Sequence, residues 1–239
     1  MAELTAAVKQ LDHPIVRFPG GTVARSYHFY KTGYDGTQAG ATENYIVPFV
    51  KMFSPAASPG LVKISYVLNI DEHFKHLAYT GSDEALINEN LAGMTYLLDH
   101  GLSILLVELG NEYSLTPELF WRRGNNPLKT IDTVQENIDI LKEIKITYTN
   151  DQAYTEAHLK DGLDKLESLF ATYQARINAL FQSRGLPRPA YGVPIHPIRT
   201  GNKYYGDTRY FLQYYNTRVK NMPNIDALIP HVYLSFASG

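Results

Sequence analysis

The stretch LSILLVELGNEY, residues Leu102 to Tyr113, decides the fold expected for this chain. Its first seven residues are largely apolar and partly β-branched, as expected for a strand that is covered on both faces. The strand runs directly into Gly110, Asn111, Glu112 and Tyr113. Gly110 and Asn111 suit a turn, but a turn needs no Glu followed by a Tyr. We therefore expect the carboxylate of Glu112 to be placed for a function.

Four other segments have the same strand-like character, and helical patterns separate them. The helix before the opening stretch is the clearest, because Ser82 can cap its start and Gly101 can end it in the left-handed conformation. A second long helix has its apolar stripe from Leu159 to Leu180 and stops at Gly185. The strand-like segments are Pro14 to Phe18, Leu61 to Leu68, Ala190 to Ile195 and Ile225 to Tyr233.

Weaker helical patterns complete the alternation. They lie at Glu3 to Leu11, at Asn44 to Phe53, around Ile131 to Ile144 and after Asp207. Strands that alternate with helices indicate an α/β fold with a parallel sheet and right-handed crossovers. Two connections are long, 27–42 and about 113–154, and long loops inside a compact domain are usually functional insertions. No linker divides the chain, so we expect one β/α domain over residues 1–239.

The composition is that of an ordinary globular protein. The 239 residues are 44% hydrophobic, and the formal net charge of -2 gives no electrostatic reason to expect nucleic acid or an anionic membrane as partner. No segment has the roughly 18 consecutive apolar residues of a membrane span, and the start lacks the features of a signal peptide. The absence of cysteine excludes a disulfide framework, yet it leaves the compartment open, secretion included. The oligomeric state is equally open.

Polar residues stand at the C-terminal ends of the strand-like segments. In a (β/α)8 barrel these ends converge on one face, where such enzymes build their sites. Any one of these residues could instead cap a helix or a turn, but five strand ends in register favour a shared site. The candidates are Arg17 with Gly20 and Gly21, Asn69, Asn111 with Glu112 and Tyr113, His196, and His231 with Tyr233.

Other kinds of site have weaker patterns. Gly20 and Gly21 could cradle a phosphate, but neither G-x-G-x-x-G nor a P-loop is present. The histidines form no H-E-x-x-H or other close ligand pair, so we expect no metal and no other cofactor. The run 71–73, Asp-Glu-His, with His76 looks like a ligand cluster at first sight. Its place where a loop meets a helix favours solvated surface instead.

Three segments resemble the strand ends of one enzyme clan. VRFPGGT at Val16 to Thr22, VELGNEY at Val107 to Tyr113 and HVY at His231 to Tyr233 are similar to signatures of the clan A retaining glycoside hydrolases. The arabinofuranosidase-like and heparanase-like families are the most similar, and those enzymes are TIM barrels. The resemblance runs in order along most of the chain and is specific in its first two segments. Tyr113 departs from the Pro that is common at that place.

The resemblance implies roles for individual residues. Glu112 resembles the general acid/base that ends strand 4 of the barrel, and Asn111 resembles the residue that contacts the sugar 2-hydroxyl. A rigid strand end suits this chemistry, since retaining hydrolysis needs two carboxyl groups roughly 5 to 5.5 Å apart. The 18 Tyr residues offer rings that could stack on sugar faces. The matching residues of strands 2 and 6 are Arg17, Gly20, Gly21, His231 and Tyr233.

In the numbering of that clan, the five strand-like segments correspond to about strands 2 to 6 of the barrel. The second Glu, the nucleophile, ends strand 7 in the clan, and no remaining strand end of this chain offers one. We therefore expect an incomplete barrel, part of a longer glycosidase whose nucleophile lies beyond Gly239. The expected enzyme is a retaining O-glycoside hydrolase that acts on polysaccharide or oligosaccharide, and the segment alone is expected to be inactive.

Two other interpretations stay open. A non-catalytic carbohydrate-binding or scaffold protein with a degenerate glycosidase barrel would bind sugar without turnover. An unrelated doubly wound α/β domain would show an open sheet with helices on both faces. The sugar, the anomer and the choice between endo and exo cleavage depend on loop shapes that these residues do not determine.

Overall fold

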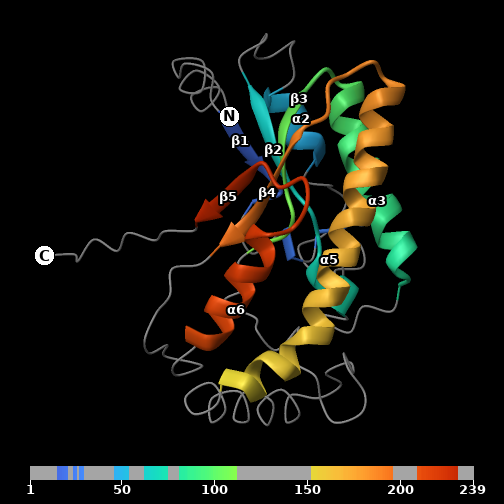
Figure 1. Ribbon diagram of the computed structural model, residues 1–239. Coiled ribbons are helices and arrows are strands. Elements are labelled where there is room, and N and C mark those ends of the chain that lie inside the picture. Colours follow the sequence, from blue (N-terminus) through green and yellow to red (C-terminus); the bar gives the residue numbers. More distant parts are fainter. Residues whose placement is uncertain are drawn as a thin grey trace, which may run out of the picture. The chain divides into compact units, whose positions relative to one another are not determined.

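The computed structural model describes residues 15–20, 24–25, 27–29, 46–53, 62–74, 81–111, 152–195 and 209–230 (Figure 1). Within these residues, strands and helices alternate along the chain. The elements are β1 (Ile15–Phe18), α2 (Ile46–Phe53), β2 (Lys63–Val67), the 3-10 helix η2 (Asp71–Phe74), α3 (Asp83–Asp99), β3 (Ser103–Glu108), α5 (Gln152–Ser183), β4 (Ala190–Ile195), α6 (Arg209–Lys220) and β5 (Ala227–Pro230).

The five strands form a parallel sheet in the order β1-β2-β3-β4-β5. This confirms the α/β class and the five predicted strands, and the bounds of β4 match the predicted segment. The helix expected at 3–11, the one around 131–144 and most of the two long connections lie outside the described residues. None of the described helices is long and apolar enough to cross a membrane.

The chain divides into two compact units. The first contains residues 1–111 and 168–191, and the second contains residues 112–167 and 192–239. The single domain expected from the sequence therefore stays a prediction. The first unit carries β1, β2, β3, α2, α3 and the second half of α5, and the second carries α6 and β5.

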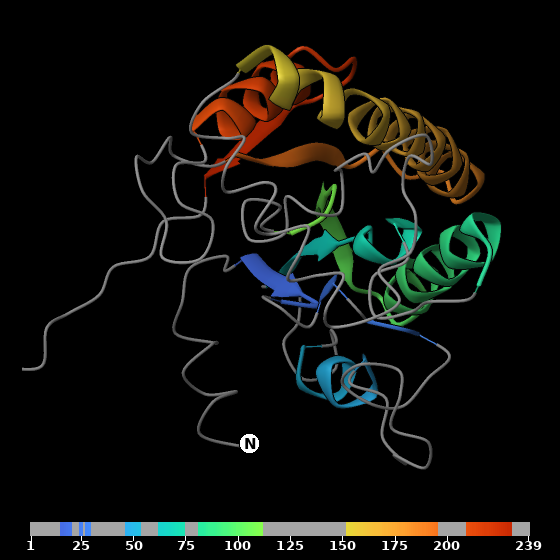
Figure 2. The ribbon, with the colours of Figure 1, turned by 90° about the horizontal axis from the view of Figure 1, so that it is seen from below.

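Helix α3 begins and ends as its sequence predicts. The hydroxyl of Ser82 accepts a hydrogen bond of 3.1 Å from the amide of Ala85, which caps the first turn. Gly101, just past the end of the helix, has a φ of 76°, which only glycine adopts at little cost. The buried face of α3 includes Met94 and Leu97, and the helix lies beside β3 (Figure 2).

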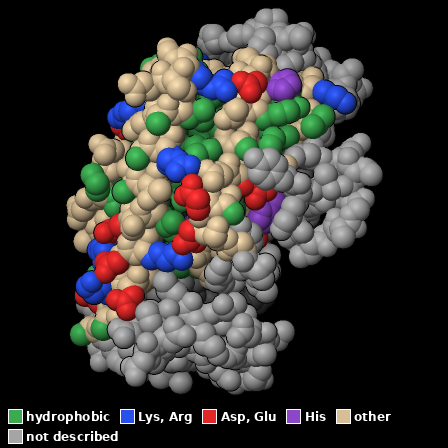
Figure 3. All heavy atoms as spheres, turned by 90° about the vertical axis from the view of Figure 1, so that its right-hand side faces the viewer, with side chains coloured by type: hydrophobic (Ala, Val, Ile, Leu, Met, Phe, Trp, Pro, Cys, Tyr) green, Lys and Arg blue, Asp and Glu red, His purple; other side chains and the backbone are tan. Residues whose placement is uncertain are grey.

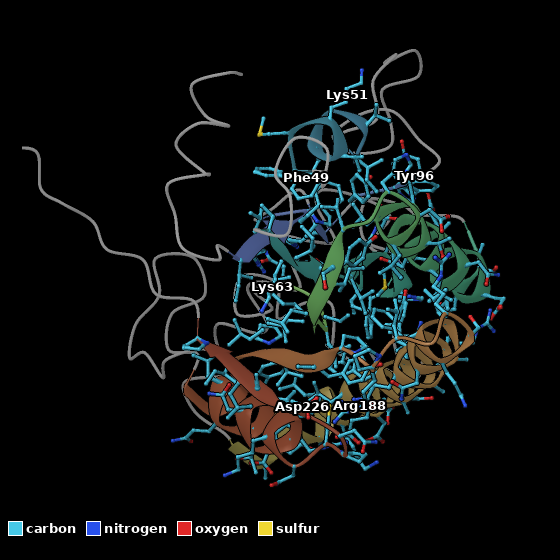
Figure 4. All side chains as sticks on the ribbon, turned by 90° about the horizontal axis from the view of Figure 1, so that it is seen from above. Phe49, Lys51, Lys63, Tyr96, Arg188 and Asp226 are labelled. Carbon is cyan, nitrogen blue, oxygen red and sulfur yellow. The ribbon has the colours of Figure 1, made fainter. Side chains whose placement is uncertain are left out.

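Aromatic rings fill the core of the first unit. The ring of Phe18 in β1 lies 4.4 Å from that of Phe49 in α2 and 6.3 Å from that of Tyr66 in β2. Phe49 is labelled on α2 in Figure 4. Tyr66 is fully buried. Its hydroxyl lies so close to α3 that a Cβ added to Gly93 would meet it at 2.6 Å. Phe18 and Tyr66 face away from Arg17 and Ser65, since successive residues of a strand alternate between the two faces.

The apolar stripe predicted for α5 is buried from Leu159 to Ile177, while Leu180 is half-buried. Gly185 follows the helix with a φ of 67°, as expected for a helix end. In the first unit, Arg176 of α5 pairs with Glu84 at 3.0 Å, and Arg184, which follows α5, pairs with Asp99 at 2.7 Å. Among the described residues on the face that Figure 3 shows, acidic and basic side chains are interspersed and form no large patch of one sign.

The second unit is described mainly through α6 and the strands around it. Leu212, Tyr215 and Val219 are buried on one side of α6, and the Tyr215 hydroxyl donates a hydrogen bond of 2.8 Å to the carbonyl of Pro194. Arg218 donates to Glu167 and to Asp164, both at 2.7 Å, which ties α6 to the first half of α5.

Candidate functional site

An ion pair joins the ends of β1 and β3 in the first unit. Nε of Arg17 donates to both carboxylate oxygens of Glu108, at 2.9 and 2.8 Å, and Nη2 donates to Oε2 at 2.6 Å. The Glu108 side chain is 4% exposed and that of Arg17 is 29% exposed. Two parallel N–H donors on one carboxylate make a fork that fixes the plane of the guanidinium.

The register of the sheet explains this pair. Arg17 is opposite Ser65 of β2, and a register shift between Ile64 and Ser65 brings Glu108 opposite Val67. Arg17, Ser65 and Glu108 therefore meet on one face of the sheet. The hydroxyl of Ser65 donates to Oε1 of Glu108 at 2.6 Å, and the Glu108 carbonyl accepts from the amide of Leu68 at 3.0 Å.

Asn111 is the third member of this group, which we name the Arg17 cluster (Arg17, Ser65, Glu108 and Asn111). Nη2 of Arg17 donates to Oδ1 of Asn111 at 2.9 Å. Because a guanidinium only donates, the oxygen of the amide must face Arg17 and its NH2 group must face away. Gly110 has a φ of 100°, a conformation that favours glycine, and it turns the chain so that Asn111 reaches Arg17. Asn111 itself is buried.

One edge of Arg17 is open. Its Nε and Nη2 are used by Glu108 and Asn111, whereas Nη1 has no hydrogen-bond partner in the part of the chain that the structure describes. Among the described residues the only buried side-chain nitrogen or oxygen without a hydrogen-bond partner is Nη2 of Arg25, so Nη1 of Arg17 is not buried, and the Arg17 side chain as a whole is 29% exposed. Such an arrangement can donate to an oxygen of a ligand without reorganisation.

A second polar group, the His28 cluster (His28, Asn69, Glu72 and Glu89), is buried in the same unit. Nε2 of His28 lies 2.6 Å from Glu72 and Nδ1 lies 2.8 Å from Glu89. Burial alone would lower the pKa of His28, but its hydrogen bonds and charge interactions with Glu72 and Glu89 outweigh this and raise it to about 9. The imidazolium therefore offsets one of the two negative charges of Glu72 and Glu89 inside the unit.

Asn69 has a structural role in the His28 cluster. Its Nδ2 donates to Glu72 and to the carbonyl of Tyr27, both at 3.2 Å, and its backbone amide donates to Asn90 at 3.1 Å. The residue is buried. These contacts are what a turn cap inside a polar network makes, so they explain the residue without a ligand.

The sequence predicted that the run 71–73 is solvated surface. The structure shows instead that η2, which contains this run, is buried. His73 bonds to Asp83 at 2.9 Å and to the hydroxyl of Tyr173 at 2.8 Å, which connects η2 to α3 and α5. Asp71 pairs with Arg25, and burial, only partly opposed by that guanidinium, raises the pKa of Asp71 to about 6. The sequence prediction was wrong because the partners of these side chains come from distant segments. His76 lies outside the described residues.

Of the other predicted site residues, Gly20 lies within the described residues and the rest lie outside them. Gly20 is exposed and follows the cis peptide bond of Phe18 and Pro19; among the described residues, an added Cβ would meet the carbonyl of Arg17 at 3.6 Å. Neither its φ nor its described surroundings require glycine there. The predicted residues that lie outside the described ranges are Gly21, Glu112, Tyr113, His196, His231 and Tyr233.

Glu108 is the residue that the sequence interpretation missed as a member of the site. It was counted as the last residue of an apolar strand, which it is. The available signal was a carboxylate at the buried end of a strand, which needs a partner, and Arg17 at the end of another strand. No group of three or more His, Asp or Glu side chains among the described residues is arranged to hold a metal ion.

The comparisons with known proteins add no relative. No protein-family model, no curated protein and no solved structure matches this chain.

Proposed function

We propose that this chain carries the acid/base half of a retaining O-glycoside hydrolase site that acts on polysaccharide or oligosaccharide. Glu112 is the general acid/base in this proposal, and Asn111 contacts the sugar 2-hydroxyl. The observation that supports it best is the hydrogen bond of 2.9 Å between Arg17 and Asn111, which joins the two most specific segments of the resemblance. Asn111 directly precedes Glu112 in the sequence.

The architecture that goes with this proposal is a (β/α)8 barrel. The strand order β1-β2-β3-β4-β5 follows the sequence without a reversal, as in a barrel. A doubly wound sheet reverses its strand order at a switch point, and its ligand binds there. The sequential order therefore favours the barrel over the doubly wound alternative.

The chemistry of the proposal requires a second carboxylate as the nucleophile. Glu108 is poorly suited to that role, because Arg17 and Ser65 occupy both of its oxygens and its side chain is buried. Asp71, Glu72 and Glu89 are also buried and paired. We therefore expect the nucleophile outside the described residues.

The substitution Glu112→Gln in the full gene product tests the proposal. It removes the proton donor but keeps the size of the side chain. Hydrolysis of substrates with poor leaving groups should fall by about 10²- to 10⁴-fold, and hydrolysis of activated aryl glycosides should fall much less. Steady-state rates on both kinds of substrate measure the difference. Equal losses on both would contradict the acid/base role.

A non-catalytic carbohydrate-binding protein is the second candidate. The observation that favours it is the burial of Asn111, since only the Arg17 edge of the Arg17 cluster reaches the surface. This alternative predicts that the protein binds oligosaccharides in calorimetry but hydrolyses none of them.

A further inference from the structure

Glu108 and Ser65 have no role in the proposed acid/base chemistry, yet they determine how Arg17 is held. Glu108 takes one edge of the guanidinium with three hydrogen bonds of 2.6 to 2.9 Å, and Ser65 fixes the carboxylate with a fourth, at 2.6 Å. A flexible arginine would lose its orientation without this fork. The positions of Nη2, toward Asn111, and of Nη1, toward the open edge, therefore both depend on Glu108.

Glu108 also decides the charge that a ligand meets at Arg17. The pair of guanidinium and carboxylate has no net charge, and its 2.6 Å contact keeps the two charges together. The open Nη1 edge is therefore a directional donor without a net positive charge. Such a donor suits a neutral hydroxyl oxygen. A carboxylate would meet the nearby negative charge of Glu108 and would gain little from a guanidinium that is already paired.

We propose that Glu108 is a positioning and specificity-determining residue, which orients and neutralises Arg17 so that Nη1 donates to a hydroxyl of a neutral sugar unit in preference to the carboxylate of a uronic acid. This inference rests on the proposed glycosidase function and names the substrate class of the same site. Glu108 acts through Arg17 and does not touch the reacting atoms. Ser65 supports it by holding Oε1.

The test compares Glu108→Gln with the wild type in the full gene product. The substrates are 4-nitrophenyl glycosides of neutral sugars, namely glucose, galactose, xylose and arabinofuranose, and the 4-nitrophenyl glycoside of glucuronic acid. Calorimetry measures binding of the corresponding free sugars. The wild type should prefer a neutral glycoside. In Glu108→Gln, kcat/KM on that glycoside should fall about 10- to 100-fold, while kcat/KM on the glucuronide should fall less or rise, because the charge of Arg17 is no longer neutralised.

The ratio of the two kcat/KM values is the decisive readout, since a loss of folded protein lowers both values equally. Glu89→Gln is the matched control, because Glu89 is also a buried carboxylate of the first unit and is paired with His28 outside the Arg17 cluster. Its ratio should equal that of the wild type. Ser65→Ala removes only the hydroxyl that holds Glu108, so it should shift the ratio in the same direction by about 2- to 5-fold, and it serves if Glu108→Gln does not fold.

The outcomes separate the inference from the function beneath it. A shift of the ratio toward the glucuronide in Glu108→Gln, or in Ser65→Ala, with no shift in Glu89→Gln supports the inference. An active wild type that prefers the glucuronide, or variants that lower both substrates equally, would overturn the inference and leave the proposed hydrolase intact. A wild type that neither hydrolyses nor binds any of these sugars would overturn the proposed function, and the inference with it.

Discussion

The Arg17 cluster and the His28 cluster use the same chemistry in opposite ways. Each places a cationic side chain beside carboxylate and amide groups in the first unit. The His28 cluster is closed, because His28 is 2% exposed and both of its ring nitrogens meet a carboxylate. The Arg17 cluster has one open edge, since the Arg17 side chain is 29% exposed. The two clusters contain similar residue types. The burial of the cation distinguishes the His28 cluster, which has a structural role, from the Arg17 cluster, which is a candidate ligand site.

The largest effect is expected from His28→Ala, which breaks the closed cluster. The substitution removes the imidazolium that contacts buried Glu72 at 2.6 Å and Glu89 at 2.8 Å, and breaking a buried ion pair by removing one partner costs about 3 to 5 kcal/mol. The free energy of unfolding from urea denaturation measures the loss. Glu84→Ala is the control, because its ion pair with Arg176 is exposed and should contribute less than about 1 kcal/mol. Similar losses in both variants would contradict the closed character of the His28 cluster.

The pH dependence of stability sharpens the comparison next. The pKa of His28 is raised from 6.5 to about 9 in the folded protein, so its contribution is fully present below pH 6.5 and is lost as the pH rises through 9. A loss on the order of 2 to 3 kcal/mol is expected across this range. The pKa of Asp71 is raised from 3.8 to about 6, so Asp71 changes the stability between about pH 3.8 and pH 6, which is outside the range in which His28 acts. The free energy of unfolding from urea denaturation at pH 6 and at pH 9 measures the loss. If His28→Ala lost as much stability between these two pH values as the wild type does, the loss would belong to another group.

A smaller effect is expected from Gly93→Ala, which tests the close packing of α3 against Tyr66. The new Cβ would lie 2.6 Å from the hydroxyl of Tyr66, and that hydroxyl donates to the carbonyl of Asn90 at 3.3 Å. Overpacking of this kind costs about 1 to 3 kcal/mol. Gly20→Ala is the control, since its Cβ would meet no described residue closer than 3.6 Å. Adding Tyr66→Phe to Gly93→Ala should recover part of the loss, and thermal denaturation of the wild type and the three variants measures it.

The smallest effect is expected from Ser65→Ala in the open cluster. Glu108 loses one hydrogen bond of 2.6 Å but keeps its bonds to Arg17, so the expected loss of stability is about 1 kcal/mol. Urea denaturation beside His28→Ala measures the contrast. A loss as large as that of His28→Ala would mean that the Arg17 cluster is as closed as the His28 cluster.

Part of the candidate site could be read from the sequence. Arg17 and Asn111 were both proposed from strand ends, and they are joined by a hydrogen bond of 2.9 Å. Their functional assignment stays a prediction. Glu108 was missed because the sequence shows a carboxylate and an arginine at two strand ends but does not show that the two strand ends meet. Its partner is 91 residues away, and only the pairing of β1 with β2 and of β2 with β3 brings the two together.

By itself, the sequence determined the elements whose causes are local. The alternation of strands and helices, the Ser82 cap and the positive φ of Gly101 and Gly185 follow from residues near each element in the chain. Only the tertiary structure decided which polar groups are buried and with whom they pair. The run 71–73, which the sequence predicted to be exposed, is buried, and Glu108 accepts hydrogen bonds from Arg17 and fixes its position. The physical reason is that the desolvation of a charge depends on partners far away in the sequence, which local patterns do not contain.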